Sequence, residues 1–340
     1  MRGRGAGFNP ENRFERLRFD SEEAPIDRLE TELLRDTSKS VLAENRSPDV
    51  PFTYSVNPYR GCEHGCAYCY ARPSHEYLGF SAGLDFETKI LVKENAPDLL
   101  EQQLSKPRWQ PQVIAMSGNT DAYQPIERKL GLTRRCLEVL QRFRNPVQII
   151  TKNALVLRDL DILSDLAEDD AAGVAVSITT LESGLVSKLE PRTSSPLRRL
   201  EAVRALREGG VRTTALIAPV IPGINDHELP QIVEACAEAG AESVGYILLR
   251  LPLTVAPIFE DWLERHFPDR KRKVLHKLQQ LRGGRRNDPR FGHRMRGTGP
   301  LADHIRSVFQ VAARRCAVDG PAAPLSTAAF RRPGEQASLF

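Results

Sequence analysis

The chain has 340 residues, of which 41 % are hydrophobic and 27 % are charged, and its formal net charge is +4. These values are typical of a soluble globular protein long enough to bury a substantial core. No apolar run is long enough to cross a bilayer, and the arginine-rich start is not followed by an apolar segment. The composition therefore excludes a membrane protein, and we expect a cytoplasmic one.

The first fifty residues predict little regular structure. Residues 1–50 carry charges of both signs and, apart from a short helical candidate around residues 27–35, show no sustained apolar period. We interpret them as an N-terminal arm. A strand-like segment follows at 53–57, and an extended, alternating segment is predicted at 85–93. A helix is predicted at 97–104, and the prolines that follow it end it.

From residue 112 onward, short apolar strands alternate with amphipathic helices. Such alternation predicts right-handed βαβ units and a parallel sheet. The strands are expected at 112–116, 147–151, 174–178, 213–219 and 243–249, and the helices at about 133–143, 155–167, 195–208 and 226–239. With the strand at 53–57 there are six units, so the predicted fold is α/β, a partial (β/α)6 TIM-type barrel over residues 51–250.

Beyond residue 250 the pattern predicts helices without strands, which form a basic C-terminal extension over residues 251–318. Between Arg265 and Arg296 there are twelve Lys or Arg residues against two Asp residues. Such a density is either a solvated helix face or a track for nucleic-acid phosphates. Residues 319–340, rich in Ala, Pro and Ser, are expected to form a flexible tail.

Three of the six cysteines lie in one short stretch. Cys62, Cys66 and Cys69 have a C-x3-C-x2-C spacing, and thiolates are the ligands that soft metals and iron–sulfur clusters select. A closed structural site wants four protein ligands, so three leave one position open for chemistry. The alternatives are a zinc site completed by His64 or His75, or three buried thiols. The other cysteines lie in helical patterns and are interpreted as core residues: Cys136, Cys236 and Cys316.

Polar residues follow the predicted strands, where a barrel places its active-site loops. They are Ser117 to Asp121, Lys152 and Asn153, Ser177 with Thr179 and Thr180, the LEPR run at 189–192, and the PVIPGIND run at 219–226. Ordinary turn and cap chemistry explains Asn225 and Asp226. It explains Lys152 poorly, because a lysine directly after an apolar strand on the same rim is well placed to meet a carboxylate.

The cysteine motif, with Tyr68 just before its last cysteine, opens a six-unit β/α pattern and resembles the radical S-adenosylmethionine (SAM) enzymes over about residues 52–250. The runs RGCEHGCAYCYAR and TKILVKENAPDLLEQQL, and the Thr-Lys after the third strand, resemble the branch that contains spore photoproduct lyase and uncharacterised bacterial relatives. The resemblance implies a 4Fe-4S cluster on Cys62, Cys66 and Cys69 whose fourth iron binds SAM. Reductive cleavage then gives a 5′-deoxyadenosyl radical that abstracts hydrogen from a substrate.

The same resemblance implies roles for individual residues. Tyr68 would contact SAM beside the cluster, and Thr120 with Asp121 would take the place of the methionine-amine contact. The remaining implied contacts are Lys152 with the methionine carboxylate, Ser177 with the ribose, Arg192 with the carboxylate or ribose, and Ile221 with the adenine. Gly118 stands where the lyase has its hydrogen-donating cysteine, so photoproduct reversal by the same route is in doubt; Tyr123, or a thiol from elsewhere in the chain, would have to substitute.

Two further features bear on partners. The chain ends in QASLF, residues 336–340, which resembles the short peptide by which bacterial repair proteins dock on the sliding clamp. A SAM-cleaving cluster also implies an electron donor such as flavodoxin or ferredoxin.

The first hypothesis is a radical SAM enzyme acting on a nucleic-acid base, in DNA repair or modification. The second keeps the enzyme but gives it a peptide or small-molecule substrate. The third is a non-catalytic metal-binding module that recruits partners to DNA.

Overall fold

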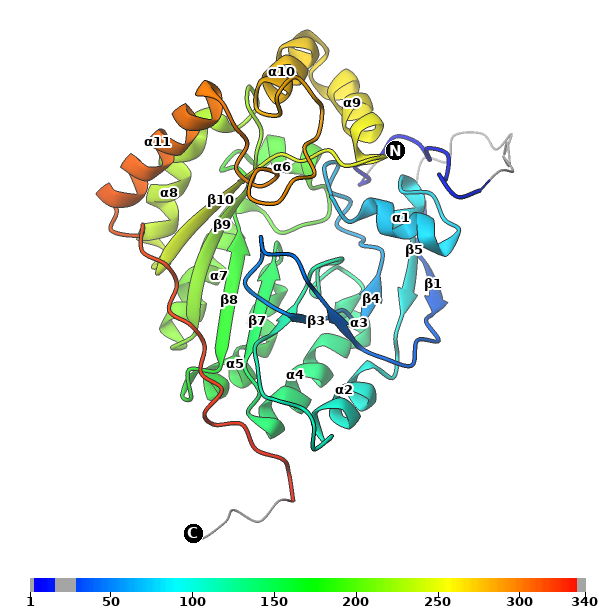
Figure 1. Ribbon diagram of the computed structural model, residues 1–340, viewed down its shortest axis with the longest axis vertical. Helices are drawn as coiled ribbons and strands as arrows, with labels where there is room; N and C mark the ends of the chain where they lie inside the picture. Colours follow the sequence, from blue (N-terminus) through cyan, green and yellow to red (C-terminus); the bar gives the residue numbers. More distant parts are fainter. Residues whose placement is uncertain (1–2, 16–28, 335–340) are drawn as a thin grey trace.

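The computed structural model describes residues 3–15 and 29–334, and its centre is a seven-stranded sheet in the order β10-β9-β8-β7-β6-β3-β2 (Figure 1). Neighbouring strands from β3 to β10 are parallel, and β2 (Leu42–Glu44) pairs antiparallel with β3 at the edge. The six parallel strands are β3 (Tyr54–Val56), β6 (Ile114–Met116), β7 (Val147–Thr151), β8 (Ala172–Ser177), β9 (Arg212–Val220) and β10 (Ser243–Leu248). The predicted partial (β/α)6 TIM-type barrel is confirmed.

Helices cover the outer face of the sheet. In Figure 1 the strands β7 to β10 lie side by side and point to one end, with helices behind them. Alternate strand residues such as Ile149, Val174 and Ile217 are fully buried under these helices. The covering elements are α2 (Ala96–Leu104), α4 (Leu132–Phe143), η2 (Ala154–Asp159), α5 (Leu160–Ala167), α7 (Pro196–Glu208) and α8 (Leu229–Glu238).

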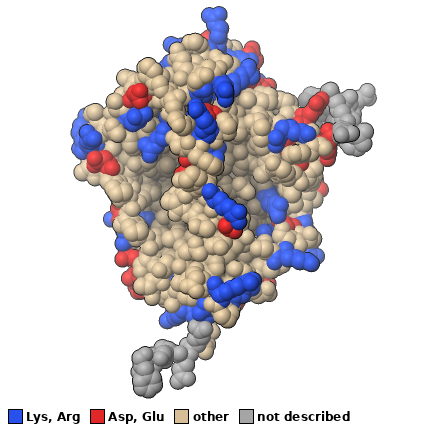
Figure 2. Space-filling view, in the orientation of Figure 1, with Lys and Arg blue, Asp and Glu red and all other residues tan. Residues whose placement is uncertain are grey.

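The inner face of the sheet is lined by small or half-exposed residues. The register pairs Ala175 with Thr214, Ser177 with Leu216 and Leu216 with Gly245, so these side chains lie on one face. Paired residues of parallel strands point the same way. Because this row is small and partly solvent-accessible, the half-barrel stays hollow; Figure 2 shows the hollow on this face of the molecule.

A second, smaller sheet lies beside the barrel, in the order β1-β5-β4. It contains β1 (Glu32–Arg35), β5 (Lys89–Val92) and β4 (Tyr59–Arg60), and it is joined to η1 (Arg72–Leu78) and α1 (Leu84–Thr88). Two expectations are corrected here. The helix predicted around residues 27–35 is a strand where it is described, because Glu32–Arg35 pairs in parallel with β5. The extended segment predicted at 85–93 begins with helix α1 instead.

Residues after the barrel form α9 (Val255–His266), α10 (Pro268–Gln280) and α11 (Pro300–Arg315). Three further short helices lie earlier in the chain: α3 (Glu127–Leu130), α6 (Ser183–Leu189) and η3 (Asp226–Glu228). Arg282 follows α10 and is buried, and its guanidinium donates hydrogen bonds to the carbonyls of Leu248, Leu249, His293 and Arg294. This arginine of the basic stretch therefore fastens the extension to the end of β10. None of the helices in the described ranges is long and apolar enough to span a membrane.

The end of the chain runs along the barrel towards the end where the strands begin (Figure 1). The Ser326 amide donates to the Asp170 carbonyl, and the Arg331 amide donates to the Phe143 carbonyl. The rings of Phe330 and Phe143 lie 6.3 Å apart. This part of the expected tail is therefore held against the core, whereas residues 336–340 lie outside the described ranges.

Candidate iron–sulfur and SAM site

The cysteine loop follows β4 and is pinned by backbone hydrogen bonds. The Cys62 amide donates to the Phe86 carbonyl over 2.9 Å, and the Ala67 amide donates to the Leu189 carbonyl over 3.0 Å. All three cysteines are free; Cys62 and Cys66 are buried, and Cys69 is half-buried. The loop therefore reaches from α1 to the end of α6 and keeps three thiols together on one tight turn.

Gly65 lies in the middle of this loop and has a left-handed backbone, with a φ of +66°. A Cβ atom added there would lie 2.7 Å from a carboxylate oxygen of Glu87. Because the Gly5 amide nitrogen would lie only 3.3 Å away and the backbone is left-handed, this position favours glycine. The loop is thus as compact as its sequence predicts for a chain that wraps closely around an inorganic group.

The chemistry of the donor set fits an iron–sulfur cluster. Burial, and then the charge of Glu190, raise the pKa of the Cys66 thiol well above its usual value, although Lys152 opposes this. Burial also raises the pKa of Cys69 to about 11. Buried thiols of this kind ionise when a metal supplies positive charge, and three thiolates with one iron unliganded match an open cluster.

Both histidines near the loop have protein partners. Burial disfavours the charged ring of His64, but the Asp121 carboxylate, 3.4 Å from Nδ1, and then Cys62 outweigh this and raise the pKa to about 10. The Nε2 atom of His64 lies 3.2 Å from the Asn153 amide nitrogen. His75 is engaged through Nε2 with the Lys89 carbonyl at 2.9 Å. The Nδ1 atom of His75 is buried without a partner, so the zinc alternative stays a prediction that metal analysis separates from a cluster.

Asp121, predicted to contact the methionine amine, is surrounded by donors from the chain itself. Its carboxylate accepts hydrogen bonds from the Thr151 hydroxyl at 2.8 Å, the Lys152 amide at 2.8 Å and the Tyr123 amide at 2.9 Å. Together with His64, these contacts tie the ends of β6 and β7 to the cysteine loop. Asp121 thus positions the rim, and its contact with SAM stays a prediction.

Tyr68 and Lys152, two other predicted contacts, meet at a carboxylate that the sequence analysis did not single out. Glu190 is fully buried and accepts hydrogen bonds from the hydroxyls of Tyr68 and Thr179, the latter at 2.6 Å. The Lys152 ammonium lies 3.8 Å from the same carboxylate and 5.8 Å from the centre of the Tyr68 ring. It also donates to the Ala218 carbonyl over 3.0 Å. The structure therefore gathers these side chains beside Cys66.

Arg199 completes this group and was also missed. Its guanidinium pairs with Glu190 at 2.5 Å and donates to the Ser177 carbonyl over 3.0 Å. Burial alone would raise the pKa of Glu190, but Arg199 and then Lys152 outweigh it and lower the pKa to about 2. Glu190 stood within the LEPR run that the sequence analysis noted, so the acidic residue after the fourth strand was the signal for it.

The other predicted contacts lie around the same rim. Thr120 is buried, and its hydroxyl donates to the Asn57 side chain over 3.3 Å. Arg192 pairs with Glu63 of the cysteine loop at 3.1 Å. Ile221 is fully buried after β9, and Ser177 lies on the inner face at the end of β8. The contact of each of these residues with SAM stays a prediction.

The N-terminal segment braces the back of the cysteine loop. The amides of Gly5 and Ala6 donate to the Glu87 carboxylate over 3.1 and 2.8 Å. The same carboxylate pairs with the buried Arg72, which donates to the Cys66 carbonyl over 2.8 Å. A Cβ atom at Gly5 would lie 1.8 Å from the Gly65 carbonyl oxygen. The described start of the predicted arm is therefore packed directly onto the cysteine loop.

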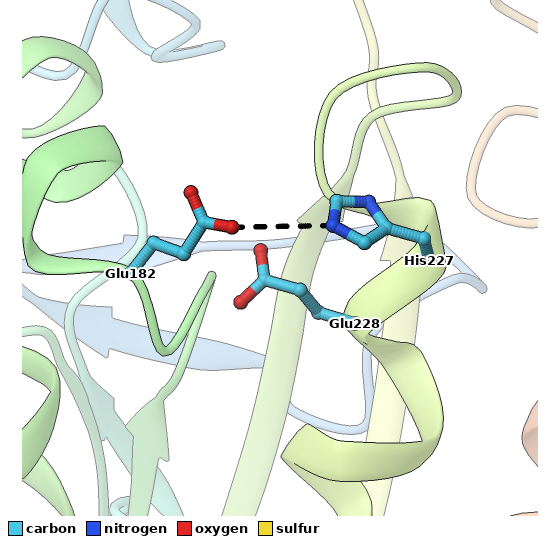
Figure 3. A group of neighbouring side chains, drawn as sticks. All are labelled: Glu182, His227 and Glu228. Carbon is cyan, nitrogen blue, oxygen red and sulfur yellow. Dashed lines mark ion pairs between the residues drawn. The ribbon is translucent and has the colours of Figure 1, made fainter.

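A second group of metal-ligating residues lies on the rim away from the cysteines. Glu182, His227 and Glu228 gather their ligand atoms within 4.8 Å of one another (Figure 3). The oxygens of Glu228 already accept hydrogen bonds from the Thr180 hydroxyl and the Leu181 amide, at 2.6 and 2.8 Å. These contacts hold η3 to the segment before α6 and account for the group as part of the fold.

The chain belongs to the radical SAM superfamily, because residues 56–236 match the family model of that description. An uncharacterised protein of Mycobacterium tuberculosis H37Rv is 37 % identical over 232 residues, which cover 67 % of this chain and 68 % of the relative. An uncharacterised protein of Methanocaldococcus jannaschii is 30 % identical over 238 residues, which cover 70 % of this chain and 85 % of the relative. Family membership implies an iron–sulfur cluster and SAM.

The fold also resembles that of spore photoproduct lyase in complex with a dinucleoside spore photoproduct. The TM-score is 0.60 at 14 % identity, and the match covers 83 % of this chain and 79 % of the lyase chain. A radical SAM Nalpha-GlyT isomerase of Pseudomonas phage M6 is 25 % identical over 223 residues, which cover 65 % of this chain and 44 % of the isomerase. The likeness to the lyase branch predicted from the cysteine motif is thus supported at the level of the fold.

Replacement of Gly5 tests the brace. We expect Gly5→Ala to push the N-terminal segment off the cysteine loop, to lower the free energy of unfolding by about 1 to 3 kcal/mol, and to reduce the iron bound per chain after reconstitution. Gly184→Ala on α6 is the matched control, since a Cβ atom there meets nothing within 4 Å. Equal iron content and equal stability of the two variants would show that the segment does not support the loop.

Glu190 should make the stability depend on pH. Because its folded-state pKa is depressed, the ionised carboxylate stabilises the protein above about pH 5, and this contribution is lost as the pH falls towards about 2. We expect urea unfolding at pH 6 to show Glu190→Gln less stable than the wild type by about 3 kcal/mol, with the difference shrinking at lower pH. Glu208→Gln, exposed on α7, is the control. A difference that does not change with pH would contradict the assignment.

Proposed function

We propose that the protein is a radical SAM enzyme in which Cys62, Cys66 and Cys69 hold a 4Fe-4S cluster. The observation that carries this proposal is the set of three buried or half-buried thiols on one braced loop. When bound, the cluster supplies the electron that cleaves SAM to methionine and a 5′-deoxyadenosyl radical, which abstracts hydrogen from a substrate.

The residues of the chain bind and orient the cofactor. Lys152 is half-buried at the end of β7 with its ammonium beside Tyr68, so it provides a fixed cation for the methionine carboxylate. Glu190 and Arg199 hold Tyr68 and the end of β8 in place. Ser177 and Ile221 are buried at the ends of β8 and β9, and we assign them the contacts with the ribose and the adenine.

The hydrogen donor of spore photoproduct lyase has no counterpart at Gly118. Tyr123 does not replace it, because its ring is fully buried and its hydroxyl donates to the Asp159 carboxylate over 3.1 Å. Cys136 and Cys236 are fully buried in the core. We therefore propose a reaction other than photoproduct reversal by the lyase route.

A nucleic acid is the substrate class that we propose, with peptides and small molecules as the alternatives. Of the twelve basic residues from Arg265 to Arg296, six pair with carboxylates and Arg282 is buried, which leaves five for solvent or a ligand. The five are Arg270, Arg272, Lys273, Arg285 and Arg296. These five residues do not form a continuous basic track, so the proposal of a nucleic-acid substrate depends more on the residues at the barrel rim.

Two partners stay predictions. An electron donor such as flavodoxin or ferredoxin is required by the proposed chemistry. Docking on the bacterial sliding clamp would depend on residues 336–340, which lie outside the described ranges.

Anaerobic reconstitution tests the proposed function. We expect about four irons and four sulfides per chain, and 5′-deoxyadenosine after reduction with dithionite in the presence of SAM. Cys62→Ala, Cys66→Ala and Cys69→Ala should each abolish both, whereas Cys316→Ala, at the end of α11, should keep both. A single zinc ion per chain, or an intact cluster that yields no 5′-deoxyadenosine, would refute the proposal.

A further inference from the structure

Arg250 is a half-buried cation at the open rim of the barrel with almost no acceptors. It follows β10, and its Nε atom is buried without a hydrogen-bond partner. Its Nη1 atom meets the sulfur of Met295 at 3.5 Å, and sulfur is a weak acceptor. Within residues 3–15 and 29–334 no carboxylate forms an ion pair with it.

Three buried arginines elsewhere in the described residues have carboxylate or carbonyl acceptors, although the Nε atom of Arg282 has none. Arg72 pairs with Glu87 and Arg199 with Glu190, each at 2.5 Å, and Arg282 donates to four backbone carbonyls. Taking a guanidinium out of water without acceptors costs free energy. The missing partner of Arg250 therefore marks a place where an anionic ligand would replace the hydrogen bonds to water that the guanidinium loses on folding.

The surroundings of Arg250 indicate where such a ligand would lie. The guanidinium carbon is 5.6 Å from the centre of the Tyr70 ring, and Tyr70 directly follows Cys69. The Tyr70 side chain is half-exposed, and its hydroxyl donates to the Gly118 carbonyl over 2.5 Å. An anion on Arg250 would thus be bound next to the cysteine loop, at the mouth of the hollow.

A second arginine–aromatic pair lies on the adjoining loop. The Arg294 guanidinium is 4.6 Å from the centre of the exposed Phe291 ring, and its charge, after burial, lowers the pKa of Arg250. Arg294 itself is paired with Asp49, so Arg250 is the cation of the two that lacks a partner. Exposed rings interleaved with arginines are typical of surfaces that bind single-stranded nucleic acid, because bases stack on the rings and phosphates meet the cations.

We propose that Arg250 anchors a phosphate of a single-stranded nucleic-acid substrate, with Tyr70 and Phe291 as the neighbouring stacking surfaces. The inference rests on the proposed function and names the substrate class for the same site. It places the anchored nucleotide beside the cluster end of the barrel, where a hydrogen atom would be removed.

The test measures the affinity of the reconstituted protein for a fluorescein-labelled single-stranded oligothymidylate of about twelve nucleotides by fluorescence anisotropy. Arg250→Gln should weaken binding about tenfold. It should also make the plot of log affinity against log salt concentration shallower, by the amount expected for the loss of about one phosphate contact. Arg204→Gln, exposed on α7 and outside the basic stretch, removes the same charge and should change affinity less than about twofold. Unchanged melting temperatures of both variants establish that they are folded.

Equal affinities of Arg250→Gln and Arg204→Gln would overturn the proposal, as would a wild-type protein that does not bind the oligonucleotide. The proposal would also be overturned if an acidic peptide competes with the oligonucleotide and inorganic phosphate does not, because the site would then bind carboxylates. Formation of 5′-deoxyadenosine by the wild type is measured separately. If SAM is cleaved but oligonucleotide binding does not depend on Arg250, only this inference is refuted. If binding depends on Arg250 but SAM is not cleaved, only the proposed function is refuted.

Discussion

The site depends on the buried ion pair between Arg72 and Glu87. Both side chains are fully buried, and neither charge is tolerable there without the other. Arg72 donates a hydrogen bond to the Cys66 carbonyl, and Glu87 accepts hydrogen bonds from the amides of Gly5 and Ala6. The pair therefore couples the three cysteines to the N-terminal segment and prevents the loop from opening when its thiols become thiolates.

A second buried pair, Arg199 with Glu190, plays the same part on the other side of the cluster loop. It joins the end of β8 to Tyr68 and holds Lys152 nearby. Between the two pairs, the charged groups that we propose as SAM contacts are held in place by the chain itself, which would lower the cost of ordering them on binding. Arg250 differs from both because its acceptor is missing from the described residues, and the substrate is the component that would supply it.

The barrel could be predicted from the sequence because its signals are local. Each of the six parallel strands lies where a short apolar run predicts it, and the cysteine motif indicated the radical SAM superfamily. Residues 84–88 and 32–35 were assigned wrongly for a shared reason. Helix α1 offers the Phe86 carbonyl to the Cys62 amide, and Glu32 begins a strand only because Lys89 pairs with it. Tertiary contacts override local periodicity in both places.

Glu190 and the brace at Gly5 could not be found from spacing. Tyr68 and Glu190 are 122 residues apart, and Gly5 and Glu87 are 82 residues apart. No local pattern encodes contacts of that range. The LEPR run did place an acidic residue at the rim, but a carboxylate that serves as a buried support looks the same in sequence as one that caps a turn.

The central claim is that three sulfur ligands leave one iron open to SAM. The most direct test is electron–nuclear double resonance on the reduced, reconstituted protein, with SAM isotopically labelled at its methionine carboxylate oxygen. The account predicts a hyperfine coupling between the labelled oxygen and the cluster. An intact, reduced cluster that shows no such coupling at saturating SAM would contradict it.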